Sequence, residues 1–88
     1  MPILVIPEAL QRFSEGQTSY QLTINNLNNF KKALEQELPQ LAEVVFEEDS
    51  LHPFVRVAMN GQLVETIDTS FPVSEQDEIE FLVAVSGG

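Results

Sequence analysis

The chain has 88 residues, of which 43% are hydrophobic and 20% are charged, and it contains no cysteine. This length suits one small domain, and the hydrophobic content is too high for a disordered protein. Without cysteine the chain cannot form a disulfide, a thiolate metal site or a thiol nucleophile. Fourteen acidic residues against four basic ones give a net charge of −10. We therefore expect no nucleic-acid partner, because phosphate would be repelled, and either basic protein partners or a charge that only keeps the domain dissolved.

The first apolar segment is too short to direct the chain into a membrane. Residues 3–6, "ILVI", are apolar, and no basic region precedes them. A signal peptide needs about 7–15 apolar residues, and a membrane-spanning helix needs about 20. We expect a soluble cytoplasmic protein that has no membrane partner and is a monomer when free.

Two strands are predicted near the start of the chain. Residues 3–6 are mostly β-branched and lie between Pro2 and Pro7, which is typical of a short buried strand. Residues 8–18 are mixed and polar and are interpreted as a loop. In "SYQLTI" at 19–24, polar and apolar residues alternate, which predicts a second strand.

The apolar period then lengthens from two residues to three or four. The recurring apolar residues are Leu27, Phe30, Leu34, Leu38 and Leu41. This spacing predicts an amphipathic helix, with Asn25 or Asn26 as its N-cap. Because proline disfavours helix in the residue before it, Pro39 should end this main helix near Glu37. A short further turn is expected at residues 41–44.

The second half of the chain is predicted to be mostly β. A polar connection at residues 46–53 leads to strand 54–59, to the turn Asn60-Gly61 and to a short strand from Gln62. Asn-Gly between alternating apolar residues is a strong hairpin signal. After a loop, "EIEFLVAV" at 78–85 is the last predicted strand. This order of elements predicts an α+β fold, with a mixed sheet packed on one main helix.

The outer face of the last strand becomes apolar toward its end. If alternate residues of this strand and of strand 54–59 face the core, the outward positions include Phe54, Arg56, Ala58, Leu82 and Ala84. Exposed apolar patches often mark partner sites, so we predict that these five residues form a docking surface. Single exposed apolar residues are also common on proteins without a partner.

The length, the order of elements and the final "SGG" resemble the ubiquitin-like sulfur carriers, the β-grasp proteins of thiamine and molybdopterin biosynthesis and their relatives. The strongest parts of the resemblance are "FVRVAMNGQ" at 54–62 and "PVSEQDEIEFLVAVSGG" at 72–88. The segments "IPEALQRFSEGQ" and "LHPFV" look closer to the carriers that serve the synthesis of cysteine or of sulfur-containing secondary metabolites. The chain departs from the family at Glu75-Gln76-Asp77, where Asp-Gly-Asp is common, and at Val85-Ser86.

The resemblance implies a β-grasp domain at residues 1–84 and a flexible reactive tail at 85–88. It implies that a separate E1-like enzyme uses ATP to join AMP to the Gly88 carboxylate. Sulfur then replaces AMP, a thiocarboxylate results, and a biosynthetic enzyme accepts the sulfur; a sulfur donor protein would be a further partner. Gly87, Ser86 and Val85 would thread through a narrow cleft of the activating enzyme, because glycine has no Cβ. The chain would then be a carrier and no enzyme, with no catalytic residue, bound cofactor or metal of its own.

Two other functions suit the same fold and tail. The chain could be the small subunit of molybdopterin synthase, with its tail inserted in the large subunit. It could also be a ubiquitin-like modifier whose Gly88 becomes linked to target lysines. Lys31 and Lys32 are its only lysines, which leaves little scope for chain-building on itself.

Two further groups of polar residues are interpreted as structural. His52, the only histidine, has no cysteine with which to form a metal or nucleophilic site, so it is expected in a loop or at the start of a strand. Glu47, Glu48 and Asp49 lack the spacing of a calcium-binding loop and are expected to form a solvated loop.

Overall fold

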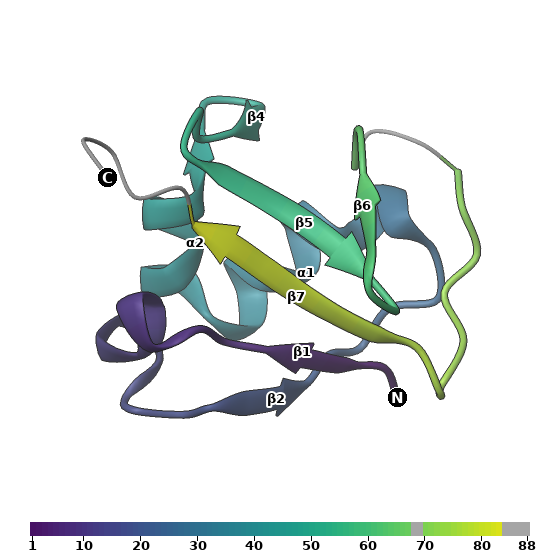
Figure 1. The fold of residues 1–88 in the computed structure, drawn as a ribbon, viewed down its shortest axis with the longest axis horizontal. Helices are drawn as coiled ribbons and strands as arrows, with labels where there is room; N and C mark the ends of the chain where they lie inside the picture. Colours follow the sequence, from purple (N-terminus) through teal and green to yellow (C-terminus); the bar gives the residue numbers. More distant parts are fainter. Residues whose placement is uncertain (68–69, 84–88) are drawn as a thin grey trace.

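One mixed sheet organises the computed structural model of the chain, which describes residues 1–67 and 70–83. Its strand order is β2-β1-β7-β5-β6. The strands are β1 (Ile3–Val5), β2 (Ser19–Gln21), β5 (Val55–Met59), β6 (Gln62–Val64) and β7 (Glu78–Val83). The pair β1–β7 is parallel and the other pairs are antiparallel. The first and last strands along the chain therefore lie side by side at the centre of the sheet (Figure 1).

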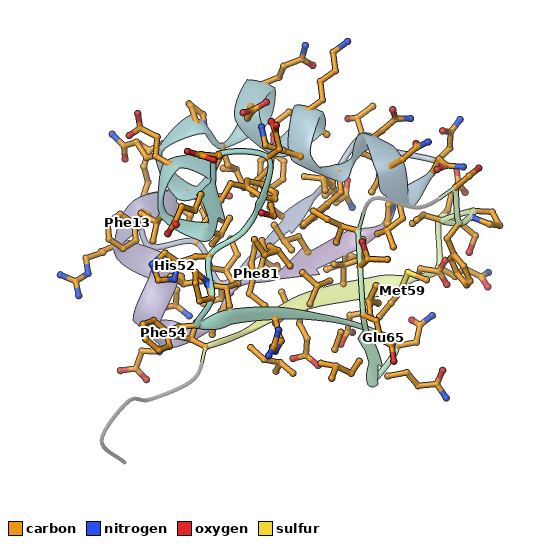
Figure 2. The ribbon with its side chains drawn as sticks, turned by 90° about the horizontal axis from the view of Figure 1, so that it is seen from above. Phe13, His52, Phe54, Met59, Glu65 and Phe81 are labelled. Atoms are coloured by element: carbon orange, nitrogen blue, oxygen red, sulfur yellow. The ribbon has the colours of Figure 1, made fainter. Side chains whose placement is uncertain are left out.

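Helices cover one face of this sheet. They are the 3₁₀ helices η1 (Glu8–Ser14) and η2 (Leu27–Asn29) and the α-helices α1 (Phe30–Glu37) and α2 (Pro39–Val45). Figure 2 shows α1 and α2 on one side of the strands, with Phe81 between the two layers. None of the helices of the described residues lies over the other side of the sheet, which we call the open face.

The register of β5 and β7 decides which side chains enter the core. Val57 lies opposite Phe81 and Met59 opposite Ile79. Because alternate residues of a strand point to opposite faces, the intervening residues of both strands belong to the open face. In the core, the Phe30 ring of α1 contacts Phe81 at 5.6 Å and Phe46 at 6.2 Å between ring centroids.

The predicted helical stripe is confirmed, and its ends follow local chemistry. Leu27, Phe30, Leu34, Leu38 and Leu41 are all buried. The Asn26 side chain accepts a hydrogen bond from the Asn28 N–H at 3.1 Å, which makes Asn26 the N-cap of η2. α1 ends at Glu37 as predicted, and Pro39 begins α2, a position where its missing N–H costs no helical hydrogen bond.

The hairpin turn is also confirmed. Asn60 and Gly61 have φ values of 53° and 83°, the left-handed pair of a two-residue turn that glycine and asparagine tolerate best. The Asn60 side chain donates to Asp77 Oδ1 and accepts from the Glu78 N–H, both at 2.9 Å. The turn of one hairpin therefore fixes the start of β7.

The structure corrects the sequence prediction in three segments. Residues 8–14 are the helix η1 rather than a loop, because Leu10 and Ser14 are buried and the Ser14 hydroxyl lies 3.1 Å from the carbonyl oxygens of Gln11 and Gln17. The short turn predicted at residues 41–44 is longer than expected and forms the helix α2, which begins at Pro39 and ends at Val45. The polar connection contains a small hairpin, β3 (Phe46–Glu47) and β4 (Ser50–Leu51).

Candidate functional site

The last described strand carries the chain out of the core beside β5. Val83, the final residue of β7, lies opposite Val55, the first residue of β5. The predicted boundary at residue 84, the tail residues Val85, Ser86 and Gly87, and the predicted modification site Gly88 lie outside the described residues. The structure therefore defines the base of the tail, which is the end of β7 and its surroundings.

Three predicted docking residues are exposed near this base. Leu82 lies opposite Arg56 on the open face and is 42% exposed. Phe54 directly precedes β5 and is 50% exposed. The Arg56 side chain forms no hydrogen bond or ion pair with any residue within 1–67 and 70–83, so its guanidinium is available to a partner. Ala84, another of the five predicted docking residues, lies outside the described residues.

Ala58 was wrongly predicted as an exposed contact. It lies on the open face but is only 3% exposed. Its neighbours across the sheet are Glu80 on β7 and Leu63 on β6, and these longer side chains flank its methyl group. Alternation along the strand placed Ala58 on the correct face, but a small residue between larger ones has little surface to offer.

Leu63 is an exposed residue of this face that the sequence prediction missed. It is 60% exposed and lies opposite Ala58. The turn length could have found it, because a two-residue turn at Asn60-Gly61 pairs Met59 with Gln62 and hence Ala58 with Leu63. We call Phe54, Arg56, Leu63 and Leu82 the open-face patch.

His52 lies next to this patch, in the loop position that was predicted for it. Its Nδ1 accepts a hydrogen bond from the Phe54 N–H at 3.2 Å, and its ring lies 5.4 Å from the Phe54 ring. Its Nε2 lies 3.8 Å from the Glu47 carboxylate. Figure 2 shows His52 and Phe54 together at the end of the sheet where β7 finishes. These contacts hold Phe54 beside the tail base.

Carboxylates border the patch along β7. Glu78 is exposed and Glu80 half-buried, and alternation puts both on the open face. Before them, Asp77 accepts hydrogen bonds from the Ser74 N–H at 2.8 Å and from the Asn60 side chain at 2.9 Å. The Ser74 N–H, followed by the Asn60 amide, lowers the pKa of Asp77 below its ordinary value. Asp77 is thereby kept ionised as part of the turn.

The described residues contain no group of three or more His, Cys, Asp or Glu side chains that could hold a metal ion. Within the same residues, no helix has the length and hydrophobicity needed to cross a membrane. An open groove of about 680 Å³ lies beside α1, and Pro2, Lys32, Val73 and Glu75 help to line it. The tail base and the open-face patch are outside this groove.

Comparison with protein families decides what this architecture is. The family model described as "ThiS family" matches residues 6–88. The chain belongs to the ThiS family. The predicted resemblance to ubiquitin-like sulfur carriers and the predicted β-grasp fold are therefore confirmed. A comparison with curated protein sequences gives no significant match.

Solved structures of carriers and modifiers share the fold of this ThiS-family chain. A chain in the crystal structure of the Amycolatopsis orientalis BexX/CysO complex has a TM-score of 0.84 at 22% identity, with 100% of both chains covered. CysO of Mycobacterium tuberculosis, described as an antigen, has a TM-score of 0.79 at 24% identity, covering 97% of this chain and 100% of its own. SAMP1 of Haloferax volcanii has a TM-score of 0.79 at 21% identity, covering 99% and 98%.

Proposed function

We propose that this ThiS-family chain carries sulfur as a thiocarboxylate on Gly88 and donates it to a biosynthetic enzyme of cysteine, cofactor or secondary-metabolite synthesis. The observation that carries the proposal is the family match, which extends through Gly87-Gly88. The proposal applies whether Gly88 is the encoded end or the product of trimming a longer precursor.

The chemistry explains why a partner enzyme is needed. A free α-carboxylate has a pKa of about 3.3–3.7, so it is ionised at neutral pH and is a poor acyl donor. An E1-like enzyme would bind ATP and transfer AMP to the carboxylate, releasing pyrophosphate. A sulfur nucleophile would then attack the carbonyl carbon, and AMP would leave with the electron pair of the broken C–O bond. In this scheme the chain is a co-substrate, and ATP is bound by the enzyme.

The open-face patch is proposed to position the chain on that enzyme. Leu82 and Phe54 supply apolar area beside the tail base, and Arg56 supplies a cation that has no ion-pair partner among the residues that the structure describes. Aromatic and arginine side chains often dominate binding energy at interfaces. A patch next to Val83 would fix the direction in which the tail leaves the domain.

The first test is intact mass spectrometry of the protein from its native cells, under conditions that preserve thiocarboxylates. We expect a species in which one oxygen is replaced by sulfur, localised to Gly88. A plain carboxylate under sulfur-demanding growth, together with lysine-linked conjugates, would instead identify a protein modifier. Co-purification of a stable large subunit would identify a molybdopterin synthase subunit.

The second test uses variants of the tail with the activating enzyme and ATP. Gly88→Ala should lower kcat/KM for adenylate formation at least about tenfold, equal to about 1.4 kcal/mol, because its Cβ would clash in a narrow cleft. Appending one residue should abolish the reaction, since the reactive carboxylate moves outward. Ser86→Ala is the matched control, because it removes the Ser86 hydroxyl and adds no atom that could clash in the cleft, and its loss should be much smaller than that of Gly88→Ala. Normal adenylation of the extended chain would refute the proposal.

A modifier function has one observation in its favour. The structural neighbours include small archaeal modifier proteins, although identities of 22% and 18% establish only the fold. In that function the activated Gly88 carbonyl would be attacked by a lysine amine rather than by sulfur. Both functions begin with the same adenylate, so mass spectrometry of the products separates them.

A further inference from the structure

The two lysines of the chain are neighbours in α1 but are held in different ways. Lys31 Nζ lies 2.8 Å from Glu35 Oε2 and 5.5 Å from the centre of the Phe46 ring, and its side chain is 27% exposed. Lys32 is exposed and forms no hydrogen bond or ion pair with any residue of the described ranges 1–67 and 70–83. The Lys31 amine must give up an ion pair and a ring contact before it can react, whereas the Lys32 amine has no such contact to lose.

Lys32 also helps to line an open groove beside α1. The groove has a volume of about 680 Å³. Its polar lining includes the amide side chains of Asn25, Asn29 and Gln36. Amides both donate and accept hydrogen bonds, so they suit the peptide groups of a chain segment that has little side-chain volume. Two consecutive glycines are such a segment.

The groove and the tail base lie at opposite ends of the sheet. β1 runs parallel to β7, with Ile3 opposite Glu78, the first residue of β7. Pro2 and Glu75, which line the groove, are therefore near the start of β7, while the tail follows its end at Val83. Six strand residues at about 3.3 Å each separate the two ends by roughly 17–20 Å. The five residues from 84 to 88 span at most about 16–18 Å even when fully extended, which leaves no slack to cover this separation and also reach the Lys32 amine. A linkage between Gly88 and Lys32 is therefore favoured between copies rather than within one.

We propose that Lys32 is the acceptor for the activated Gly88 of a second copy of this chain, and that its groove receives the Gly-Gly end. The proposal rests on the activation of Gly88 described above. The neutral Lys32 amine attacks the Gly88 carbonyl carbon of the adenylate, a C–N bond forms and the C–O bond to AMP breaks. AMP leaves with the electron pair, and the proton released from nitrogen passes to a base in solvent. The product is an isopeptide bond.

Such a linkage is head-to-tail, because each copy offers one donor and one acceptor on different surfaces. A heterologous contact of this kind extends with each added copy unless the rotation between copies closes it into a ring. Each copy also adds ten negative charges, so salt should favour the longer chains by screening their repulsion. We expect a ladder of linear conjugates whose yield rises with protein concentration.

The experiment replaces enzymatic activation by a chemical thioester. The full chain is prepared with a mercaptoethanesulfonate thioester on Gly88, which is feasible because the chain has no cysteine to interfere. It is incubated in mildly alkaline buffer, and the conjugates are mapped by tandem mass spectrometry. We expect Gly88–Lys32 isopeptides, a loss of at least about tenfold in Lys32→Arg and near-normal yield in the matched control Lys31→Arg.

A small acylating reagent distinguishes the effect of the groove on Lys32 reactivity from the effect of side-chain exposure alone. We expect the preference for Lys32 over Lys31 to be larger with the protein thioester than with acetyl N-hydroxysuccinimide. Gln36→Ala should lower conjugation without changing acetylation of Lys32. If both reagents prefer Lys32 over Lys31 to the same extent, the groove has no role. If the linkage maps to Lys31 or to the Met1 amine, or forms within one copy, the assignment of Lys32 as the acceptor is wrong. These outcomes leave the thiocarboxylate test untouched, because no activating enzyme or sulfur takes part.

Discussion

Glu37 joins the sheet edge to the end of α1 through one carboxylate. It accepts weak hydrogen bonds from the Thr23 N–H and hydroxyl at 3.4 and 3.5 Å. A negative charge at a helix C-terminus is opposed by the helix dipole. Its contacts with Thr23, just after β2, offset part of that cost.

The pKa of Tyr20 is raised above its ordinary value, and Glu37 contributes to this shift. Burial of the phenol is the larger cause, followed by the hydrogen bond and the charge of Glu37. Glu37→Gln should therefore lower the Tyr20 pKa toward its ordinary value of 10.0 without reaching it, because burial remains. Tyr20 is the only tyrosine and tryptophan is absent, so ultraviolet absorbance of the phenolate reads this one residue. A titration identical to that of the wild type would show that Glu37 does not act on Tyr20.

The sign of the stability effect follows from the same shift. The folded state holds the Tyr20 proton more tightly than the unfolded chain, so stability is lost as pH rises from about 10 through the folded pKa. Tyr20→Phe should remove this part of the alkaline loss. Thermal unfolding of both proteins across that pH window provides the check.

At the scale of elements, the sequence predicted most where the local pattern and the tertiary fold agree. The Leu27-to-Leu41 stripe, the end of α1 before Pro39 and the Asn60-Gly61 hairpin depend on nearby residues, and all three are present. η1 and the β3–β4 hairpin could not be predicted. Their residues are largely polar, and what orders them is contact with distant parts, such as the hydrogen bond between the Ile6 N–H and the Thr18 carbonyl that closes the η1 segment.

The candidate site was predicted to a similar extent. Strand alternation correctly identified Phe54, Arg56 and Leu82 as exposed. Alternation predicts the face of the sheet on which a residue lies but not how much of its surface is exposed, so the prediction was wrong for Ala58. The difference between Lys31 and Lys32 depends on Glu35 and on the distant Phe46 ring. An (i, i+4) pairing with Glu35 can be read from the sequence, whereas the ring contact needs the folded chain.

Asn60 allows backbone strain and hydrogen bonding to be separated within one turn. Asn60→Gly keeps a residue suited to φ of 53° but loses two side-chain hydrogen bonds to the start of β7, at a cost of about 1–2 kcal/mol. Asn60→Ala loses the same bonds and keeps a Cβ in the left-handed region without the polar side chain that lets asparagine tolerate it, so it should cost about 1–2 kcal/mol more than Asn60→Gly. Urea unfolding measures both. Equal destabilisation by the two variants would mean that the turn conformation contributes no strain.

For the molecule as a whole, the tail base and the open-face patch lie together while the surrounding surface is strongly acidic. A net charge of −10 favours encounter with a basic enzyme surface, and this steering weakens as salt screens it. Arg56, which pairs with no side chain of residues 1–67 and 70–83, lies on the open face that also carries Glu78 and Glu80. Charge would thus govern the rate of encounter, while apolar contact near Val83 would hold the tail in the active site.

Leu82 and Leu63 test whether apolar contact near the tail base, rather than charge, holds the chain on the enzyme. Both are exposed leucines of the open-face patch, but they lie at different distances from the tail. Leu82 directly precedes Val83, whereas Leu63 lies across β5 on the edge strand β6. Leu82→Asp should lower kcat/KM for adenylation of Gly88 at least about tenfold, because docking would bury an unpaired charge. Leu63→Asp introduces the same charge and should have a smaller effect. Both side chains are at least 42% exposed, so neither variant should unfold the domain, and thermal unfolding would confirm that. If the two variants lose activity equally, net charge rather than contact at the tail base controls docking, and added salt should then slow adenylation of every variant by the same factor.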